Sequence, residues 1–314
     1  MKTIEELRVE LAAIMHANGI NLKLYLGTGN SQAREYWLAD FDDGATEAVC
    51  RQFVASIDQF LLNKDLATKP LTDLDYRTDT LFMYDLDERP TEFAELSDLL
   101  AGKDRDVFNF RESDLTNVTS LAIKISSVQS SVLFFKKFYP VSLVKRDQIL
   151  LVVRDNTRFS LIDQDILKVT GGFEVLMLGN EFYINDFGKF EKSFAFDQIA
   201  KNAMQQVVAK ITASNLVTDA KSYLAEGFGS RKDILRAGKS RVLDLDVATV
   251  IAFVQAKQQQ IGIKVADGKL LLSSKDSVKK LYKLLNDDYL TSELTHVDYE
   301  TLAKNELAAI IAAR

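Results

Sequence analysis

Four pairs of aspartates, each separated by one residue, come closest in this sequence to a metal-dependent active site. The pairs are Asp73/Asp75, Asp85/Asp87, Asp163/Asp165 and Asp244/Asp246. Alternate residues of a β-strand point to the same face, so a pair on a strand could share a Mg²⁺ ion. Asp85 and Asp87, with Glu88 beside them, fit best because they end a strand that we expect over residues 81–86.

This acidic group leaves a Mg²⁺-dependent nuclease using Asp85, Asp87 and Glu88 open as an alternative function. The chain holds 45 Asp and Glu residues, so several such pairs arise by chance. No lysine stands nearby in the register that a nuclease core uses. We therefore interpret each pair as a solvated turn, and we expect neither a metal site nor a catalytic residue.

Nucleophilic catalysis and phosphate-loop chemistry have even less support. The histidines are His16 and His296, and Cys50 is the single cysteine. One cysteine excludes an internal disulfide and a multi-cysteine zinc site. Gly27 and Gly29 follow an expected strand, but the third glycine and the Lys-Ser/Thr pair of a phosphate-binding loop are missing. The sequence thus predicts a binding protein without a cofactor rather than an enzyme.

Basic clusters in the middle of the chain point to an anionic ligand. Residues 221–241 hold six Lys/Arg, two Asp/Glu and three glycines, and a helix is expected to begin near Ser230. Cations, glycine backbone and free helix N–H groups can contact phosphates without reading a base sequence. Our first choice of DNA contacts is Arg231, Lys232, Arg236, Lys239 and Arg241. The second choice is Lys136, Lys137, Lys145 and Arg146, which flank Phe138-Tyr139-Pro140.

The distribution of charge supports the same region. Residues 1–123 hold 12 Lys/Arg and 23 Asp/Glu, a net charge of −11. Residues 124–241 hold 18 and 12, a net charge of +6, and residues 242–314 hold 9 and 10. Such asymmetry is a physical argument about partners rather than about fold. An ordinary solvated surface, or attraction between the two parts of the molecule, remains the alternative.

The hydrophobic pattern predicts an α+β protein. Residues 1–115 are expected to form an acidic N-terminal α/β region, with helices over 3–18 and 46–63. From Val118 the pattern changes to short strands and turns, with hairpins at Gly179-Asn180 and Asp267-Gly268. Residues 116–314 are therefore expected to form a mostly antiparallel sheet closed by C-terminal helices. Lys275, Lys279 and Lys283 share one face of such a helix and are interpreted as solvated.

Five motifs stand out in the rest of the chain: residues 138–146, Phe173 with the strand behind it, Phe182-Tyr183-Ile184-Asn185, Phe190-Glu191-Lys192-Ser193-Phe194 and residues 289–295. Together they resemble the KwaB-like family, the soluble component of the bacterial Kiwa anti-phage defence system. The resemblance covers about residues 118–305. It implies a DNA-binding, dimeric effector that works with a membrane-embedded KwaA-like partner. The pair would sense infection and repress phage DNA replication and late transcription.

We therefore expect a non-catalytic DNA-binding protein of the cytoplasm that is recruited to the inner membrane through its partner. No apolar run approaches the length needed to span a bilayer. The acidic N-terminal region is expected to face away from DNA and to be available to a protein partner. A pure protein–protein adaptor is the third function that the sequence leaves open.

Overall fold

The computed structural model describes most of the chain and divides it into two compact units. The first unit consists of Met1–Leu71 and Tyr76–Phe196, and the second of Thr72–Asp75 and Asp197–Arg314. The described residues are 2–31, 33–61, 65–73, 79–109, 112, 114–139, 143–144, 150–154, 158–162, 166–219, 222–224, 226, 228–292, 294 and 298–300. The fold class is α+β, as the hydrophobic pattern predicted.

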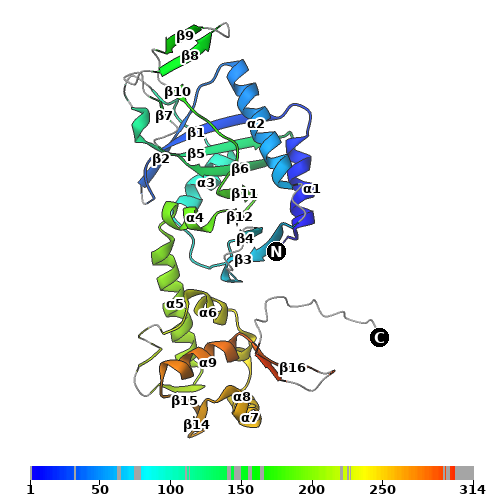
Figure 1. The fold of residues 1–314 in the computed structure, drawn as a ribbon, viewed down its shortest axis with the longest axis vertical. Helices are drawn as coiled ribbons and strands as arrows, with labels where there is room; N and C mark the ends of the chain where they lie inside the picture. The colour runs from blue at the N-terminus through cyan, green and yellow to red at the C-terminus, as the bar shows by residue number, and fades with distance from the viewer. Residues whose placement is uncertain are drawn as a thin grey trace. The chain divides into compact units, whose positions relative to one another are not determined.

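A large open sheet forms the centre of the first unit (Figure 1). In the described residues its strand order is β2-β1-β5-β6-β11-β12-β4-β3, and every neighbouring pair is antiparallel except β3 with β4. The bounds are β1 (Asn21–Asn30), β2 (Ala33–Leu38), β3 (Ala67–Pro70), β4 (Thr80–Met83), β5 (Val118–Ser126), β6 (Ser131–Lys137), β11 (Val175–Leu178) and β12 (Glu181–Ile184). Two smaller ladders are β7 (Leu143–Val144) with β10 (Ile166–Leu167) and β8 (Leu150–Arg154) with β9 (Arg158–Ile162).

The boundary that we expected between residues 115 and 116 falls inside this sheet. β1 pairs with β5 from Asn21 to Thr28, and β12 pairs with β4. Strands from both expected regions therefore share one hydrogen-bonded ladder. The chain divides near residue 196 instead, where the sheet ends and the helical second unit begins. Short η1 (Leu71–Asp73) and η2 (Leu115–Asn117) lie in the connections.

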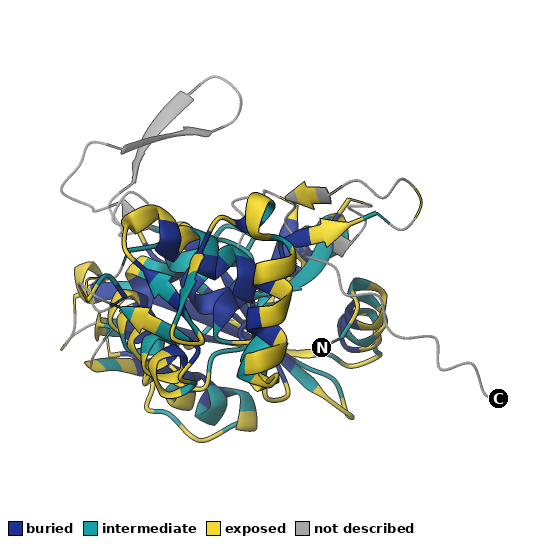
Figure 2. Cartoon of the chain, turned by 90° about the horizontal axis from the view of Figure 1, so that it is seen from below, coloured by how far each residue is buried: buried dark blue, intermediate teal, exposed yellow. Residues whose placement is uncertain are grey.

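Two helices cover one face of the sheet because their apolar stripes match its alternation. α1 (Ile4–Met15) begins at a capping box formed by Thr3 and Glu6, as predicted. The core that α1 and α2 (Asp43–Leu61) close includes Leu11, Phe53 and Phe134. Figure 2 shows the buried residues gathered on the inner sides of the elements.

An aromatic cluster fills the opposite face of the sheet, under α3 (Glu92–Ala101) and α4 (Phe187–Ser193). Phe135 follows Phe134 on β6 and so points to the other face. Its ring lies 4.7 Å from that of Phe194, and Phe93 stacks on Phe182 at 3.6 Å. The family-like aromatic motifs therefore build the core of the first unit rather than a binding surface.

The second unit is mainly helical. Its helices are α5 (Phe196–Ala213), α6 (Arg231–Ala237), η4 (Arg241–Asp244), α7 (Val247–Ala256), α8 (Gln258–Ile261) and α9 (Lys275–Leu285). They enclose a small sheet, β13 (Val217–Asp219)-β15 (Lys269–Leu272)-β14 (Lys264–Ala266), while β16 (Tyr289–Thr291) pairs with β17 (Asp298–Glu300). Both predicted hairpins are confirmed, because Gly179 and the Asp267-Gly268 pair adopt positive φ angles between antiparallel strands.

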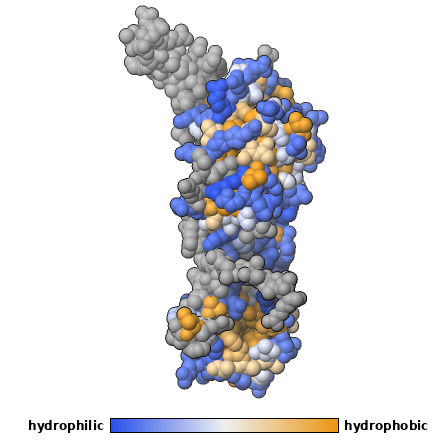
Figure 3. Space-filling view, turned by 90° about the vertical axis from the view of Figure 1, so that its right-hand side faces the viewer, coloured by the Kyte–Doolittle hydropathy of each residue, from blue (hydrophilic) through white to orange (hydrophobic). Residues whose placement is uncertain are grey.

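No described helix is both long enough and apolar enough to span a bilayer. On the face drawn in Figure 3 the described surface is mostly hydrophilic, and apolar side chains reach it in patches.

Candidate nucleic-acid interface

The segment that we ranked first begins with a capped helix, α6. The Ser230 hydroxyl accepts a hydrogen bond from the Asp233 N–H at 3.1 Å and donates one to the Asp233 carboxylate at 2.6 Å. α6 is only seven residues long. The Ser230 side chain thus already occupies the Asp233 N–H, and the Asp233 carboxylate places an anion in the first turn. Both features make the start of α6 less favourable for a phosphate than a helix end without them.

Arg236 is buried and cannot be a surface phosphate contact, contrary to our first choice. Its guanidinium Nη1 donates to Oδ1 of Asp288 at 3.1 Å, and Nη2 donates to the Asn286 carbonyl at 3.1 Å. The Nε atom lies 3.6 Å from Oδ1 of Asp73. Because a buried charge is tolerated only when it is paired, these contacts give Arg236 a structural role within the second unit.

The other four cations of the segment reach the surface. Lys239 and Arg241 are exposed, and Lys232 is half-buried. Arg231 Nη2 lies 2.8 Å from Oδ1 of Asp197, and these side chains are 37% and 67% exposed. An exposed ion pair contributes only about 1 kcal/mol or less, so a phosphate could replace Asp197 as the partner. We call Arg231, Lys232, Lys239 and Arg241 the basic patch of the second unit.

Two glycines of this segment serve internal packing rather than close approach to a phosphate. A Cβ atom on Gly229 would lie 2.7 Å from Cε2 of Tyr282, and the residue has φ +145°. A Cβ atom on Gly238 would lie 2.6 Å from Cγ2 of Val207 on α5. Gly227, the third glycine of the argument, lies outside the described residues. The two described glycines therefore allow the backbone on either side of α6 to pack closely against Tyr282 and Val207.

Lys136, from the second-choice group, uses its ammonium inside the first unit. Its Nζ donates to the Thr170 carbonyl at 3.1 Å, to the Thr170 hydroxyl at 2.6 Å and to the Gly171 carbonyl at 2.9 Å. Burial lowers the pKa of this amine, with Glu174 acting in the opposite direction. Lys136 ties residues 170–171 to the end of β6, so its expected role as a DNA contact is not supported by its geometry.

Lys137 stays half-exposed at the end of β6. Its backbone N–H donates to Oε2 of buried Glu174 at 2.9 Å, and its Nζ lies 5.8 Å from the centre of the Tyr139 ring. Lys145 and Arg146 lie outside the described residues. Of the second-choice group, Lys137 is therefore the one described cation whose charge faces solvent.

Sequence reasoning placed Lys275 on a plain solvated face, and the structure gives it a neighbour. Its Nζ lies 4.1 Å from the centre of the Phe228 ring. Phe228 stands two residues before Ser230, the N-cap of α6. Lys275 therefore extends the positive surface beside the start of α6. The regular spacing of lysines on α9 was the available signal, but nothing local linked that helix to α6.

The acidic residues of the nuclease alternative, Asp85, Asp87 and Glu88, come directly after β4. Asp85 is half-buried, while Asp87 and Glu88 are exposed. In the part of the chain that the structure describes, no group of three or more His, Cys, Asp or Glu side chains is arranged to hold a metal ion. No geometric observation therefore favours the nuclease alternative.

The fold and its surface define an α+β protein of two units, the second of which carries an exposed basic patch. Residues 115–295, which extend across both units, match the family model described as Kiwa protein KwaB-like. The curated Kiwa protein KwaB of Escherichia coli O55:H7 (strain RM12579 / EPEC) is 26% identical over 288 residues, which cover 88% of this chain and 91% of that protein. No solved structure matches.

The chain belongs to the KwaB-like family, as the motifs of the sequence indicated. Membership implies that it is a component of the Kiwa anti-phage defence system. The family model covers the basic patch as well as the strands from β5 to β16.

Proposed function

We propose that this protein is a non-catalytic DNA-binding effector of Kiwa defence that holds DNA through the basic patch of its second unit. The observation that carries the proposal is that four cations reach the surface between the start of α6 and the start of η4. Arg231 and Lys232 are half-buried, while Lys239 and Arg241 are exposed. Residues 197–241 hold eight Lys/Arg and four Asp/Glu, an excess of basic residues that supports an anionic ligand.

The chemistry of the patch favours contacts with the DNA backbone over readout of bases. Flexible cations on a surface neutralise phosphates and release condensed counterions, which stabilises binding to any sequence. Gly229 and Gly238, which flank α6, are used in internal packing, so we assign this task to the side chains of the patch. The expected interaction is therefore salt-dependent and nearly independent of sequence.

The partners that we propose are those that the family resemblance implies. We propose that the protein forms a homodimer in the cytoplasm and is recruited to the inner membrane by a KwaA-like transmembrane protein. The complex would repress phage DNA replication and late transcription. The acidic N-terminal region supports a division of labour, because its net charge of −11 would be repelled by phosphates within a Debye length of about 8–10 Å.

Fluorescence anisotropy with a labelled duplex DNA tests the proposal. The variant Lys232→Glu/Lys239→Glu/Arg241→Glu should bind at least about tenfold more weakly than the parent, because three phosphate contacts become repulsive. The matched control Lys23→Glu/Lys103→Glu/Lys264→Glu makes the same change in net charge at exposed lysines elsewhere and should bind like the parent. Parent-like binding by the first variant, with an unchanged circular dichroism spectrum, would refute the site.

The nuclease alternative needs its own test. Linear and circular DNA incubated with the protein and Mg²⁺ or Mn²⁺ should remain intact. If the protein cleaves DNA and Asp85→Ala abolishes the cleavage, the protein is a nuclease and the proposed non-catalytic function is wrong. The adaptor alternative predicts instead that no variant or salt concentration reveals binding to DNA.

A further inference from the structure

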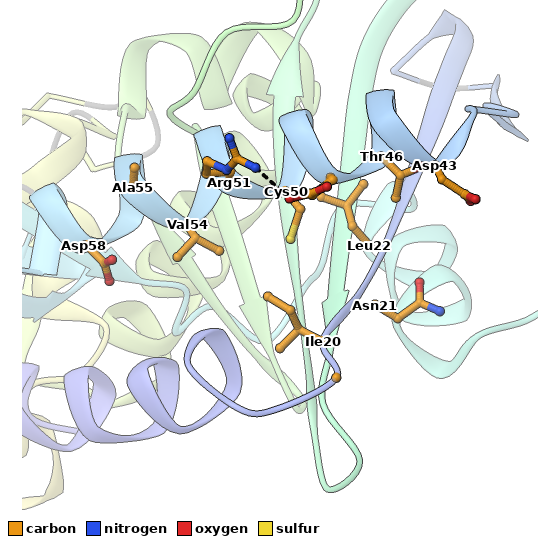
Figure 4. A pocket seen from close by; sticks show the side chains of 12 residues that line it. Ile20, Asn21, Leu22, Asp43, Thr46, Cys50, Arg51, Val54, Ala55 and Asp58 are labelled. Atoms are coloured by element: carbon orange, nitrogen blue, oxygen red, sulfur yellow. Dashed lines mark hydrogen bonds and ion pairs between the residues drawn. The ribbon is translucent and has the colours of Figure 1, made fainter.

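The first unit has a cavity of about 760 Å³ between α2 and the start of β1. Its walls come from the turn after α1 and from one side of α2. Figure 4 shows lining residues from both segments, among them Leu22, Asp43, Cys50, Val54 and Asp58. Cys50 and Val54 point from α2 toward Ile20 and Leu22, so the floor of the cavity is apolar (Figure 4).

The cavity lies where β1 extends beyond its neighbour β2. Leu38, the last residue of β2, pairs with Tyr25. The Ala39 N–H then donates to the Leu24 carbonyl at 2.8 Å, after which the chain turns away and enters α2 at Asp43. The first residues of β1 therefore pair with β5 on one side, and on the other side a strand position is left open.

The backbone of Leu22 faces this open position. In an antiparallel ladder, the N–H and C=O groups of alternate residues point to the same side. The Leu24 carbonyl points toward β2, so the N–H and C=O of Leu22 point the same way. Leu22 is only 7% exposed, and among the described residues these two groups have no hydrogen-bond partner. Buried backbone groups normally have hydrogen-bond partners, so this edge of β1 is able to pair with a further strand.

The rim of the cavity is acidic. Asp43, Glu47 and Asp58 line it together with one cation, Arg51, a net charge of −2. Arg51 already pairs with Glu47 at 2.6 Å, and Asp58 Oδ1 lies 2.8 Å from Nε2 of His16. Asp43 is the third carboxylate of the lining, and its residue is exposed. Burial raises the pKa of the Cys50 thiol, so this side chain is neutral and adds to the apolar floor.

We propose that an extended segment of a partner protein adds as a strand to the Leu22 edge, with an apolar side chain in the cavity and Lys or Arg residues at the rim. Strand addition draws its affinity from main-chain hydrogen bonds and its specificity from side-chain pockets. The unpaired N–H and C=O groups of Leu22 supply the main-chain hydrogen bonds. The apolar floor and its acidic rim supply the side-chain specificity. The proposal does not depend on the proposed binding of DNA.

The probe is a fluorescein-labelled peptide with a Val-Ile-Val centre and two lysines at each end. It should bind the full chain, and N-methylation of its central amides should weaken binding by about tenfold or more because the main-chain hydrogen bonds can no longer form. Glu47→Lys and Val54→Arg should weaken binding by a similar factor. Glu5→Lys is the control for Glu47→Lys, because the Glu5 side chain is also 73% exposed and also pairs with an arginine of its own helix, Arg8, at 2.6 Å. Gln59→Arg controls for Val54→Arg on the same helix outside the lining.

The position of the peptide can be read from Cys50, because it is the single cysteine of the chain. Saturating peptide should slow the alkylation of Cys50 by iodoacetamide, followed by mass spectrometry, and should protect the Leu22 amide from hydrogen exchange. Equal binding of the N-methylated peptide would reduce the interaction to charge attraction and overturn strand addition. Absence of binding, or an unchanged rate of Cys50 alkylation, would overturn the site.

Discussion

Arg236 Nη1 lies 3.1 Å from Oδ1 of Asp288, and these side chains are only 9% and 4% exposed. The same guanidinium also donates to the Asn286 carbonyl at the end of α9. One of the cations that give residues 124–241 their net charge of +6 therefore holds α6 against the end of α9. A charge count along the sequence overstates what the surface can offer to DNA.

Replacing Arg236 should destabilise the second unit rather than only weaken binding to DNA. Arg236→Met leaves Asp288 buried without its cation, which we expect to lower the free energy of unfolding by about 3–5 kcal/mol. Urea denaturation measures the loss. Arg241→Met, at an exposed side chain, should change the same quantity by about 0.5 kcal/mol or less. The double variant Arg236→Met/Asp288→Leu should recover part of the loss, and a parent-like Arg236→Met would contradict the structural role.

A substitution at Gly229 distinguishes a role in packing from a role in phosphate binding. Gly229→Ala puts a Cβ atom 2.7 Å from Cε2 of Tyr282 at φ +145°, a conformation that essentially only glycine adopts. The variant should lose about 1–3 kcal/mol of stability in thermal unfolding. Gly188→Ala, where a Cβ atom meets its nearest neighbour at 3.7 Å, should not destabilise the chain. A stable Gly229→Ala variant with weakened DNA binding would restore the phosphate interpretation.

The buried Glu174 carboxyl should make the stability of the first unit depend on pH. Burial raises its pKa, while the Lys137 N–H and Lys189 act in the opposite direction and Asp186 reinforces the rise. The protonated form therefore suits the fold, so the contribution of Glu174 is full below its unfolded pKa of about 4.3 and is lost as pH rises through the raised folded value.

Glu174→Gln mimics the protonated form and should escape that loss. The free energy of unfolding of the variant, minus that of the parent, should therefore increase from about pH 4 to pH 7. Chemical denaturation across this range provides the measurement. Glu5→Gln, at a side chain that is 73% exposed, is the control for loss of a carboxylate. A difference that stays constant or decreases with pH would contradict the direction of the shift.

Local patterns were enough to predict many of the elements but not their partners. The capping box at Thr3, the amphipathic α1 and the Asp267-Gly268 hairpin each depend on neighbours within a few residues, and each is confirmed. The pairing of β1 with β5 joins residues about one hundred positions apart, and no local pattern encodes it. The expected boundary at residue 115 consequently fell within a single sheet.

Contacts between distant residues also decide which cations of the candidate site are buried. The sequence indicated a basic segment around α6, and the structure exposes Lys239 and Arg241 there. It could not show that Arg236 meets Asp288, fifty-two residues further along, or that Lys136 reaches Thr170. The number of cations in a segment is local information, whereas the burial of each cation depends on distant parts of the chain.

The salt dependence of DNA affinity tests the central claim most directly, that the basic patch of the second unit binds DNA through phosphates. The logarithm of the association constant of the parent should fall linearly with the logarithm of salt concentration, by about 0.9 per neutralised phosphate. The neutral variant Lys232→Ala/Lys239→Ala/Arg241→Ala should bind more weakly at every salt concentration, with a slope shallower by about 0.9 for each phosphate that it no longer neutralises. A salt-independent parent, or a variant with the slope of the parent, would contradict the account.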